Sequence, residues 1–290
     1  MAILYWLILV VYISALSLSM AFFGINWWRV ETKYKRSPQR LMVLIYMVNF
    51  VVLFYGFGVP FLIQLIINIL QILGVFFGSQ FQIIGLTGGI ATGKSTVSHL
   101  LQDNGFDIID ADKISRELMD NDVGLQQAVK KAFGLQILDE NGVIDRDKLG
   151  AIVFSDPEKR RIINKLTHPR IFRKIISSVI KLKLIQRKPL VVLDAPLLFE
   201  TKILEHFCYP IITVYCEDGQ TQLKRLMNRN SITEQEAMQK INSQFPISVK
   251  VKMSDIVLEN GKTLEDLQKN VINKVIPQVY QKLGYIDSAQ

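Results

Sequence analysis

The chain has few cysteines and histidines, the residues that cross-link small extracellular folds or bind structural metal ions. Cys208 and Cys216 are its only cysteines among 290 residues, and they are not spaced as a C-x-x-C pair. Its three histidines, His99, His168 and His206, are scattered. The sequence therefore predicts neither a disulfide framework nor a structural metal site, and it favours a reducing compartment.

Charge is missing from two long stretches. Residues 1–28 and 41–78 contain no Lys, Arg, Asp or Glu. The first stretch is long enough to span a bilayer, and it carries aromatic side chains near its two ends, as membrane segments often do. These are Tyr5, Trp6, Trp27 and Trp28. A cleaved signal peptide is the alternative, but its basic residues would precede the apolar run, whereas here they follow it.

The second apolar stretch, residues 41–78, would measure about 57 Å as one helix, against a hydrocarbon core of about 30 Å. Glycine and proline between Gly56 and Pro60 predict a break near its middle. The basic connector 29–40 should face the cytosol, and so should the domain that follows it, because its thiols are expected to stay reduced. We therefore expect a membrane hairpin with arms at 41–55 and 61–77, either spanning or re-entrant. A single tilted helix and a wrongly joined exon are the alternatives.

Residues 80–290 have the composition of one α/β domain of roughly 200 residues, enough for a substantial core. Alternating strands and helices predict a parallel sheet with helices on both faces. The formal net charge is +8, half of it from residues 29–40. No dense basic patch with aromatic platforms is present, so no nucleic-acid partner is expected. A mildly positive domain suits polyphosphate ligands.

The clearest motif is G-x-x-x-x-G-K-S, which runs from Gly88 to Ser95. It lies between an expected strand at 81–86 and a helix from Val97, the context that a phosphate-binding loop requires. Glycines let the backbone N–H groups converge on an anion, and the helix N-terminus adds its positive dipole end. Lys94 is expected to reach the β- and γ-phosphates of ATP, and Ser95 to hold Mg²⁺. The expected ATP-binding residues are Gly88, Gly89, Ile90, Ala91, Thr92, Gly93, Lys94, Ser95 and Thr96.

Acidic residues follow two further expected strands, at 106–110 and 190–194. Ligands of doubly wound folds collect at the carboxyl ends of strands, so Asp112 is a candidate for chemistry. Asp110 is expected to cap the helix that follows. Asp194 ends an apolar run in the manner of a Walker B strand, which makes it a candidate magnesium ligand.

The remaining pattern predicts helices at 113–119, 123–133, 147–154, 157–166, 170–186, 221–230 and 263–283, and strands at 211–216 and 255–258. Asp139 to Gly142 matches the D-x-x-G of GTP-binding switches, but no N-K-x-D motif accompanies it, so a turn is favoured. His168, before Pro169, is expected to be either a helix cap or a ligand contact. Thr233 begins a capping box.

In combination, these residues resemble the dephospho-CoA kinase family over residues 82–282. The matching segments are 85–90, 109–112, 166–169, 196–200 and 222–226, together with Gln244, Pro246, Lys250, Asp255, Asn260 and Gly261. The phosphate loop alone is generic, but this ordered combination is specific. The chain departs from the family at Asn230, where the lid usually carries aspartate after arginine.

The resemblance implies a P-loop fold of the nucleoside-monophosphate-kinase type, with a helical acceptor region at about 111–188 and a lid at about 219–250. It implies transfer of a phosphoryl group from ATP, with Mg²⁺, to the ribose 3′-hydroxyl of dephospho-CoA. Asp112 would be the base and Arg225 the lid arginine that meets the phosphates. Residues implied to contact the acceptor are Thr87, Asp112, His168 and Leu197.

The whole chain is therefore expected to be a membrane anchor at 1–79 followed by a kinase domain at 80–290 that faces the cytosol. Another membrane-anchored P-loop kinase of a small molecule is one alternative. The other is a scaffold that binds nucleotide without turnover. Loss of Lys94, Asp112 or Arg225 would mark such a scaffold, and all three are present.

Overall fold

The computed structural model describes residues 9, 11–14, 16–20, 24, 38–57 and 59–285. The chain divides into two compact units, one formed by Met1–Asp107 with Leu190–Gln290 and the other by Ile108–Pro189. Most of the expected first apolar span, its flanking tryptophans and the connector up to residue 37 lie outside the described residues.

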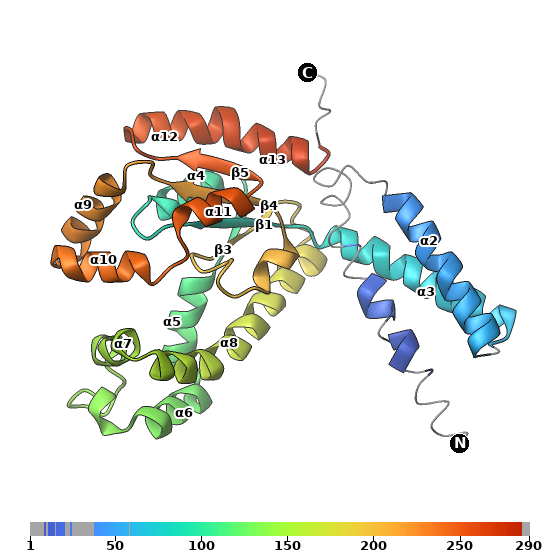
Figure 1. Ribbon diagram of the computed structural model, residues 1–290, viewed down its shortest axis with the longest axis horizontal. Helices are drawn as coiled ribbons and strands as arrows, with labels where there is room; N and C mark the ends of the chain where they lie inside the picture. Colours follow the sequence, from blue (N-terminus) through green and yellow to red (C-terminus); the bar gives the residue numbers. More distant parts are fainter. Residues whose placement is uncertain are drawn as a thin grey trace. The chain divides into compact units, whose positions relative to one another are not determined.

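A five-stranded sheet in the order β2-β3-β1-β4-β5 carries the fold (Figure 1). Strand β1 pairs in parallel with β3 and β4, and β4 pairs in parallel with β5. The central strands are buried almost throughout, and half of their residues are Val, Ile or Leu, as expected for strands covered on both faces. The strands are β1 Ile83–Gly88, β2 Asp107–Asp110, β3 Val191–Asp194, β4 Cys208–Tyr215 and β5 Ile256–Glu259. The predicted α/β fold with a parallel sheet is confirmed.

The helices of the first unit follow the strands in the predicted alternation. Helix α4 lies beside α12, and α11 packs against β4. Thr233 and Glu236 form the predicted capping box at the start of α10. The bounds are α4 Lys94–Asp103, η5 Leu204–Phe207, α9 Gly219–Asn230, α10 Glu234–Asn242, α11 Ile247–Met253, α12 Leu264–Asn270, η6 Val271–Val275 and α13 Ile276–Lys282.

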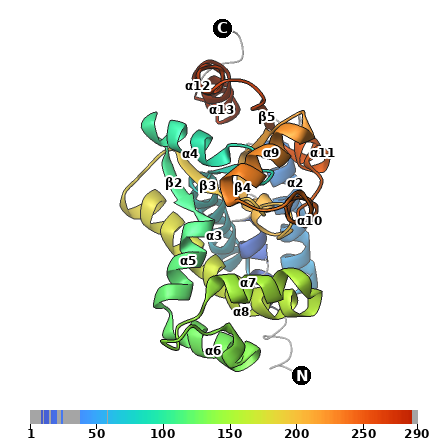
Figure 2. The ribbon, with the colours of Figure 1, turned by 90° about the vertical axis from the view of Figure 1, so that its left-hand side faces the viewer.

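The second unit is a helical bundle in which α5, α6 and α7 pack against α8 (Figure 2). Its core holds Leu125, Val129, Phe133, Ile137, Leu149 and Ile163. The predicted turn after Leu138 is confirmed, because the Gly142 N–H donates to the Asp139 carbonyl at 3.1 Å. The bounds are α5 Ala111–Asn121, α6 Val123–Phe133, η3 Leu135–Ile137, α7 Arg146–Ser155, α8 Pro157–Ile180 and η4 Lys181–Ile185.

The predicted break at Pro169 is wrong, because α8 continues through it. Proline removes one backbone donor, but burial of Thr167 and Ile175 on either side of it keeps the helix packed. The Arg170 Nη1 donates to the Leu166 carbonyl at 2.9 Å, so a side chain partners one of the neighbouring carbonyls. His168 is exposed in mid-helix and is therefore not a cap.

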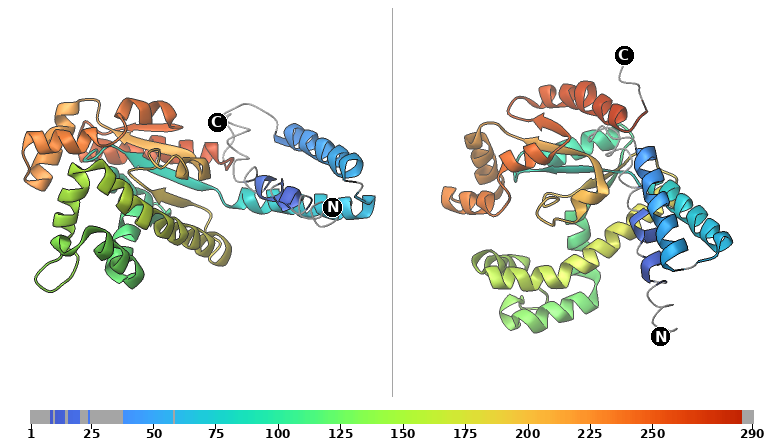
Figure 3. Two further views of the ribbon diagram at one scale, coloured as in Figure 1. Left: turned by 60° about the horizontal axis from the view of Figure 1, so that its bottom comes forward. Right: turned by 45° about the vertical axis from the view of Figure 1, so that its right-hand side comes forward.

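The predicted break in the second apolar stretch is confirmed. Helix α2 Pro38–Val51 and the short π-helix η2 Val52–Gly56 are followed by a turn and then by α3 Phe61–Gln80 (Figure 3). The turn is closed by the Val59 N–H, which donates to the Leu53 carbonyl at 2.9 Å. In the described part of the chain, no helix is both long and apolar enough for a membrane span, so the expected transmembrane helices are not found there.

Polar side chains join the arms of this helical hairpin. The Asn49 Nδ2 donates to the Asn68 Oδ1 at 3.1 Å and to the Gln71 Oε1 at 3.3 Å. The Tyr12 hydroxyl donates to the Asn49 Oδ1 at 3.3 Å. Asn49, Gln64 and Gln71 are each only 1% exposed, whereas many large apolar side chains of α3 face outward. The hairpin thus buries its amides and exposes its hydrocarbon.

Asp110 caps α5 as predicted, because its Oδ1 accepts the Lys113 N–H at 2.9 Å. We expect Asp110→Ala to lower the free energy of unfolding by about 1 kcal/mol, since one N-terminal N–H loses its partner. Urea unfolding followed by circular dichroism measures the change. Asp110→Asn is the matched control and should unfold like the wild type, because asparagine caps equally well. An unshifted midpoint for Asp110→Ala would contradict the capping role.

Candidate active site

The phosphate loop lies between β1 and α4 and depends on two left-handed residues. Ala91 has φ +59° and Gly93 has φ +88°. A Cβ at Gly93 would lie 2.1 Å from the Asn260 Nδ2, and one at Gly88 would lie 2.5 Å from the Val214 carbonyl oxygen. Glycine is therefore required at both positions for close approach, and at Gly93 also for the backbone conformation.

Side chains from three later segments hold the backbone of this loop. The Ile90 N–H donates to the Gln244 Oε1 at 3.0 Å, and the Gln222 Nε2 donates to the Ile90 carbonyl at 2.8 Å. The Asn260 Nδ2 donates to the Thr92 carbonyl at 2.8 Å. Reasoning from the sequence did not assign this role, because each contact links residues more than 130 positions apart. Only their presence in the family pattern marked these three residues.

Lys94 and Asp194 form an ion pair at the carboxyl end of the sheet. Lys94 is the first residue of α4, and Asp194 ends β3 opposite Leu86 of β1. Ser95 is exposed on the first turn of α4. The Ser95 hydroxyl and the Asp194 carboxylate are oxygen donors of the kind that Mg²⁺ prefers, so these residues fit the expected ion.

Arg225 of α9 contacts the same end of the sheet. Its Nη1 donates to the Asn260 carbonyl at 2.8 Å and lies 3.4 Å from the Cys216 Sγ. Burial raises the pKa of the Cys216 thiol, which keeps it protonated, and the nearby Arg225 charge opposes that shift. Asn230 is exposed at the end of α9 and accepts a hydrogen bond from the Arg229 Nε at 2.9 Å.

The loop also packs onto the helices that follow β4. Leu223 and Leu226 of α9 and Ala237 of α10 form a buried cluster, and Ile90 and Ala91 of the phosphate loop pack against it. The loop is therefore fixed by apolar contacts as well as by hydrogen bonds. A shift of α9 would therefore move the phosphate loop.

Two residues expected on the acceptor side lie in the first unit. Thr87 is fully buried, and its hydroxyl donates to the Pro196 carbonyl at 3.1 Å. Leu197 follows in the loop after β3, with 44% of its surface exposed. Leu197 is therefore available to a ligand, and its loop is held to β1 by the Thr87 hydrogen bond.

The other two expected acceptor residues lie in the second unit. Asp112 is exposed on the first turn of α5, and His168 is exposed on α8. The structure thus gathers Thr87, the phosphate loop, Asp194 and Arg225 within the first unit, and it places Asp112 and His168 on two helices of the second.

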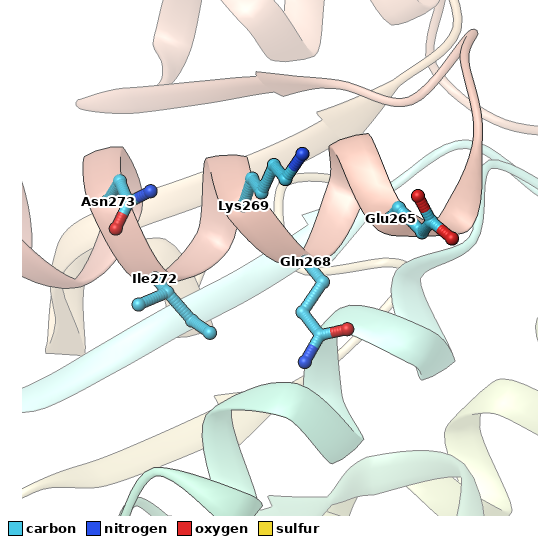
Figure 4. A pocket seen from close by; sticks show the side chains of 5 residues that line it. All are labelled: Glu265, Gln268, Lys269, Ile272 and Asn273. Atoms are coloured by element: carbon cyan, nitrogen blue, oxygen red, sulfur yellow. The ribbon is translucent and has the colours of Figure 1, made fainter.

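A hollow on α12 and η6 contains none of the expected residues. Figure 4 shows its lining, Glu265, Gln268, Lys269, Ile272 and Asn273. These side chains come from successive turns of one helical segment. The hollow is therefore separate from the phosphate loop and adds nothing to the site described above.

Comparison with known proteins shows which family the chain resembles. A family model described as "Dephospho-CoA kinase" matches residues 82–266. The dephospho-CoA kinase domain-containing protein of Danio rerio is 43% identical over 190 residues, covering 66% of this chain and 82% of that protein. Dephospho-CoA kinase of Oryza sativa is 41% identical over 204 residues, covering 70% of this chain and 87% of its own.

A solved structure agrees with these sequence matches. Dephospho-CoA kinase from Campylobacter jejuni superposes with a TM-score of 0.52 at 30% identity, covering 70% of this chain and 98% of that one. Residues 82–266, which the family model matches, include the phosphate loop, its clamps and the ion pair at the end of β3. The chain belongs to the dephospho-CoA kinase family.

Proposed function

We propose that this chain transfers the γ-phosphoryl group of ATP to the ribose 3′-hydroxyl of dephospho-CoA, giving ADP and CoA, the last step of CoA synthesis. The observation that carries the proposal is the family match over residues 82–266, which contains an intact phosphate loop paired with Asp194. An isolated phosphate loop would support any kinase, whereas the family match selects this acceptor.

Charge neutralisation and alignment are what phosphoryl transfer needs from a protein. Residues 88–96 would hold the phosphates through backbone N–H groups at the start of α4. Lys94 and Arg225 would neutralise charge on the phosphates. Ser95 and Asp194 would hold Mg²⁺, which supplies further neutralisation of the β- and γ-phosphate oxygens when bound.

The residues that the family pattern implies for the acceptor are Thr87 and Leu197 of the first unit and Asp112 and His168 of the second. We assign the acceptor region to 111–188 and the lid to 219–250. Asp112 would take the proton of the 3′-hydroxyl, while His168 and Leu197 would contact the substrate. Thr87, which is fully buried, would act by holding the Pro196 carbonyl beside Leu197. Asp110 caps α5, as its hydrogen bond to the Lys113 N–H shows, and Asp112 lies on the first turn of the same helix.

Residues 1–78 would attach the kinase to a lipid bilayer on its cytosolic side. The support is the inverted polarity of the hairpin: Leu62, Ile66 and Leu70 are exposed, whereas Asn49 and Gln71 are buried. Helices that face water show the opposite pattern. Helices in lipid pair their polar side chains with one another and present apolar ones outward. We propose partial insertion of the hairpin rather than a full span.

Removal of the loop lysine tests the kinase assignment. We expect Lys94→Ala to cost at least about 3 kcal/mol of transition-state stabilisation, the scale of losing one preorganised charge contact. A coupled ADP assay with dephospho-CoA measures kcat/KM. The same assay with nucleoside monophosphates in place of dephospho-CoA tests the alternative that the chain is a kinase for another small molecule. Lys274→Ala, on the exposed side of η6, is the control. Activity of Lys94→Ala within a few-fold of wild type would contradict the kinase assignment.

Neutralising the base tests its identity. We expect Asp112→Asn to lower turnover by about 10²–10⁴, because the acceptor hydroxyl loses its proton acceptor. Binding of ATP should be almost unchanged, which equilibrium dialysis can measure. Asp110→Asn is the matched control, two residues away, and should keep turnover. The reverse result would make Asp110 the base.

Vesicle flotation tests the membrane proposal. The full chain, mixed with phosphatidylcholine vesicles in high salt, should float with the lipid. Ile66→Lys with Leu70→Lys should remain at the bottom, because two charges on one face of α3 oppose insertion. Leu135→Lys with Val143→Lys, at exposed apolar sites of the second unit, should float normally. Failure of the wild-type chain to float would exclude attachment to lipid by this segment.

A further inference from the structure

Lys250 of α11 is a fully buried lysine, with 0% of its side chain exposed. Its Nζ donates to the Glu200 Oε1 at 2.8 Å, to the Pro196 carbonyl at 2.8 Å and to the Gly88 carbonyl at 3.3 Å. An ammonium has three protons, so these acceptors account for all of them. Burial lowers the pKa of Lys250, and its hydrogen bond to Glu200 opposes that shift.

The three acceptors belong to separate segments of the site. Gly88 ends β1 and begins the phosphate-loop motif. Pro196 and Glu200 lie in the loop that follows Asp194, and the Pro196 carbonyl also accepts the Thr87 hydroxyl. The Glu200 Oε1 additionally accepts the Phe245 N–H at 3.0 Å. One ion pair therefore joins the end of β1, the loop after β3 and the chain leading into α11.

Stability alone is a poor explanation for this pair. Moving two charges out of water costs about as much free energy as their attraction returns, and apolar replacements are often neutral or better. The arrangement is also incomplete, since the Glu200 Oε2 is buried and has no hydrogen-bond partner among the described residues. What the pair adds is a fixed distance between the Gly88 carbonyl at the start of the phosphate loop and the Pro196 carbonyl in the loop after β3.

We propose that Lys250 and Glu200 are positioning residues for phosphoryl transfer, which hold the loop at 196–200 against the first residue of the phosphate loop. This inference rests on the proposed function. Leu197 of that loop would contact the acceptor, and the phosphate loop holds the donor. The pair would therefore keep the acceptor and donor subsites in register, where a misplacement of about 1 Å can cost 10²-fold in rate.

The test removes both charges and preserves the shape. In Lys250→Met with Glu200→Gln, methionine replaces the lysine stem and glutamine keeps an acceptor for the Phe245 N–H. We expect the double variant to unfold near the wild-type midpoint, while kcat with dephospho-CoA falls by about 10- to 100-fold and the KM for ATP changes little. Amide exchange in peptides covering 85–93 and 196–200 should become faster. The control is Lys269→Met with Glu265→Gln, which removes two exposed charges of α12 outside the acceptor region and the lid.

Each outcome is decisive. A folded double variant with wild-type kcat and unchanged exchange would overturn the inference. If the double variant does not fold, Glu200→Asp keeps the charge pair but retracts the carboxylate by one methylene. Its kcat should fall, and full activity in folded Glu200→Asp would overturn the inference. Wild-type turnover of dephospho-CoA is measured first, so its absence would reject the proposed function, and the exchange data would still test the positioning role.

Discussion

A phosphate-binding loop has to leave its N–H groups pointing at an anion, so most of its backbone cannot be held by regular secondary structure. In this chain, amide side chains supply the missing support. Gln222, Gln244 and Asn260 reach the loop from three later segments and bond its carbonyls and one N–H. Because buried backbone groups need partners, this arrangement fixes the loop and occupies only one of its N–H groups, that of Ile90. The buried Lys250 adds a bond to the Gly88 carbonyl at the start of the loop, and α9 and α10 pack against Ile90 and Ala91.

Local signals were enough to predict most of the fold. The span of α6, the capping box at Thr233 and the turn after Leu138 depend on residues close in sequence, and each was found where expected. The helix through Pro169 was missed because burial of its neighbours outweighs the preference of one residue. The clamps of the loop left no local pattern at all, since they join distant segments.

The site residues likewise divide into those that local sequence marks and those that only the folded chain reveals. Position in the chain identified Lys94 and Asp194, because a motif and a strand end mark them, and the structure pairs their side chains. The position of Asp110 before α5 also predicted its capping bond, which the structure confirms, whereas the role of Asp112 stays a prediction. Nothing in the sequence could show that Lys250 is fully buried, because exposed lysines have the same local surroundings. Tertiary burial of a charge is visible only in the folded chain.

Asn260 takes part in two contacts at once. Its side-chain amide bonds the Thr92 carbonyl, and its own carbonyl accepts the Arg225 guanidinium. Residues that share a partner contribute non-additively to stability and catalysis. Both acceptors here are backbone carbonyls, so the Arg225 contact survives a change of side chain at Asn260, whereas the bond to the Thr92 carbonyl does not. A lineage could therefore replace Thr92 without losing either of these two contacts, but replacing Asn260 would release the loop backbone from the end of β5.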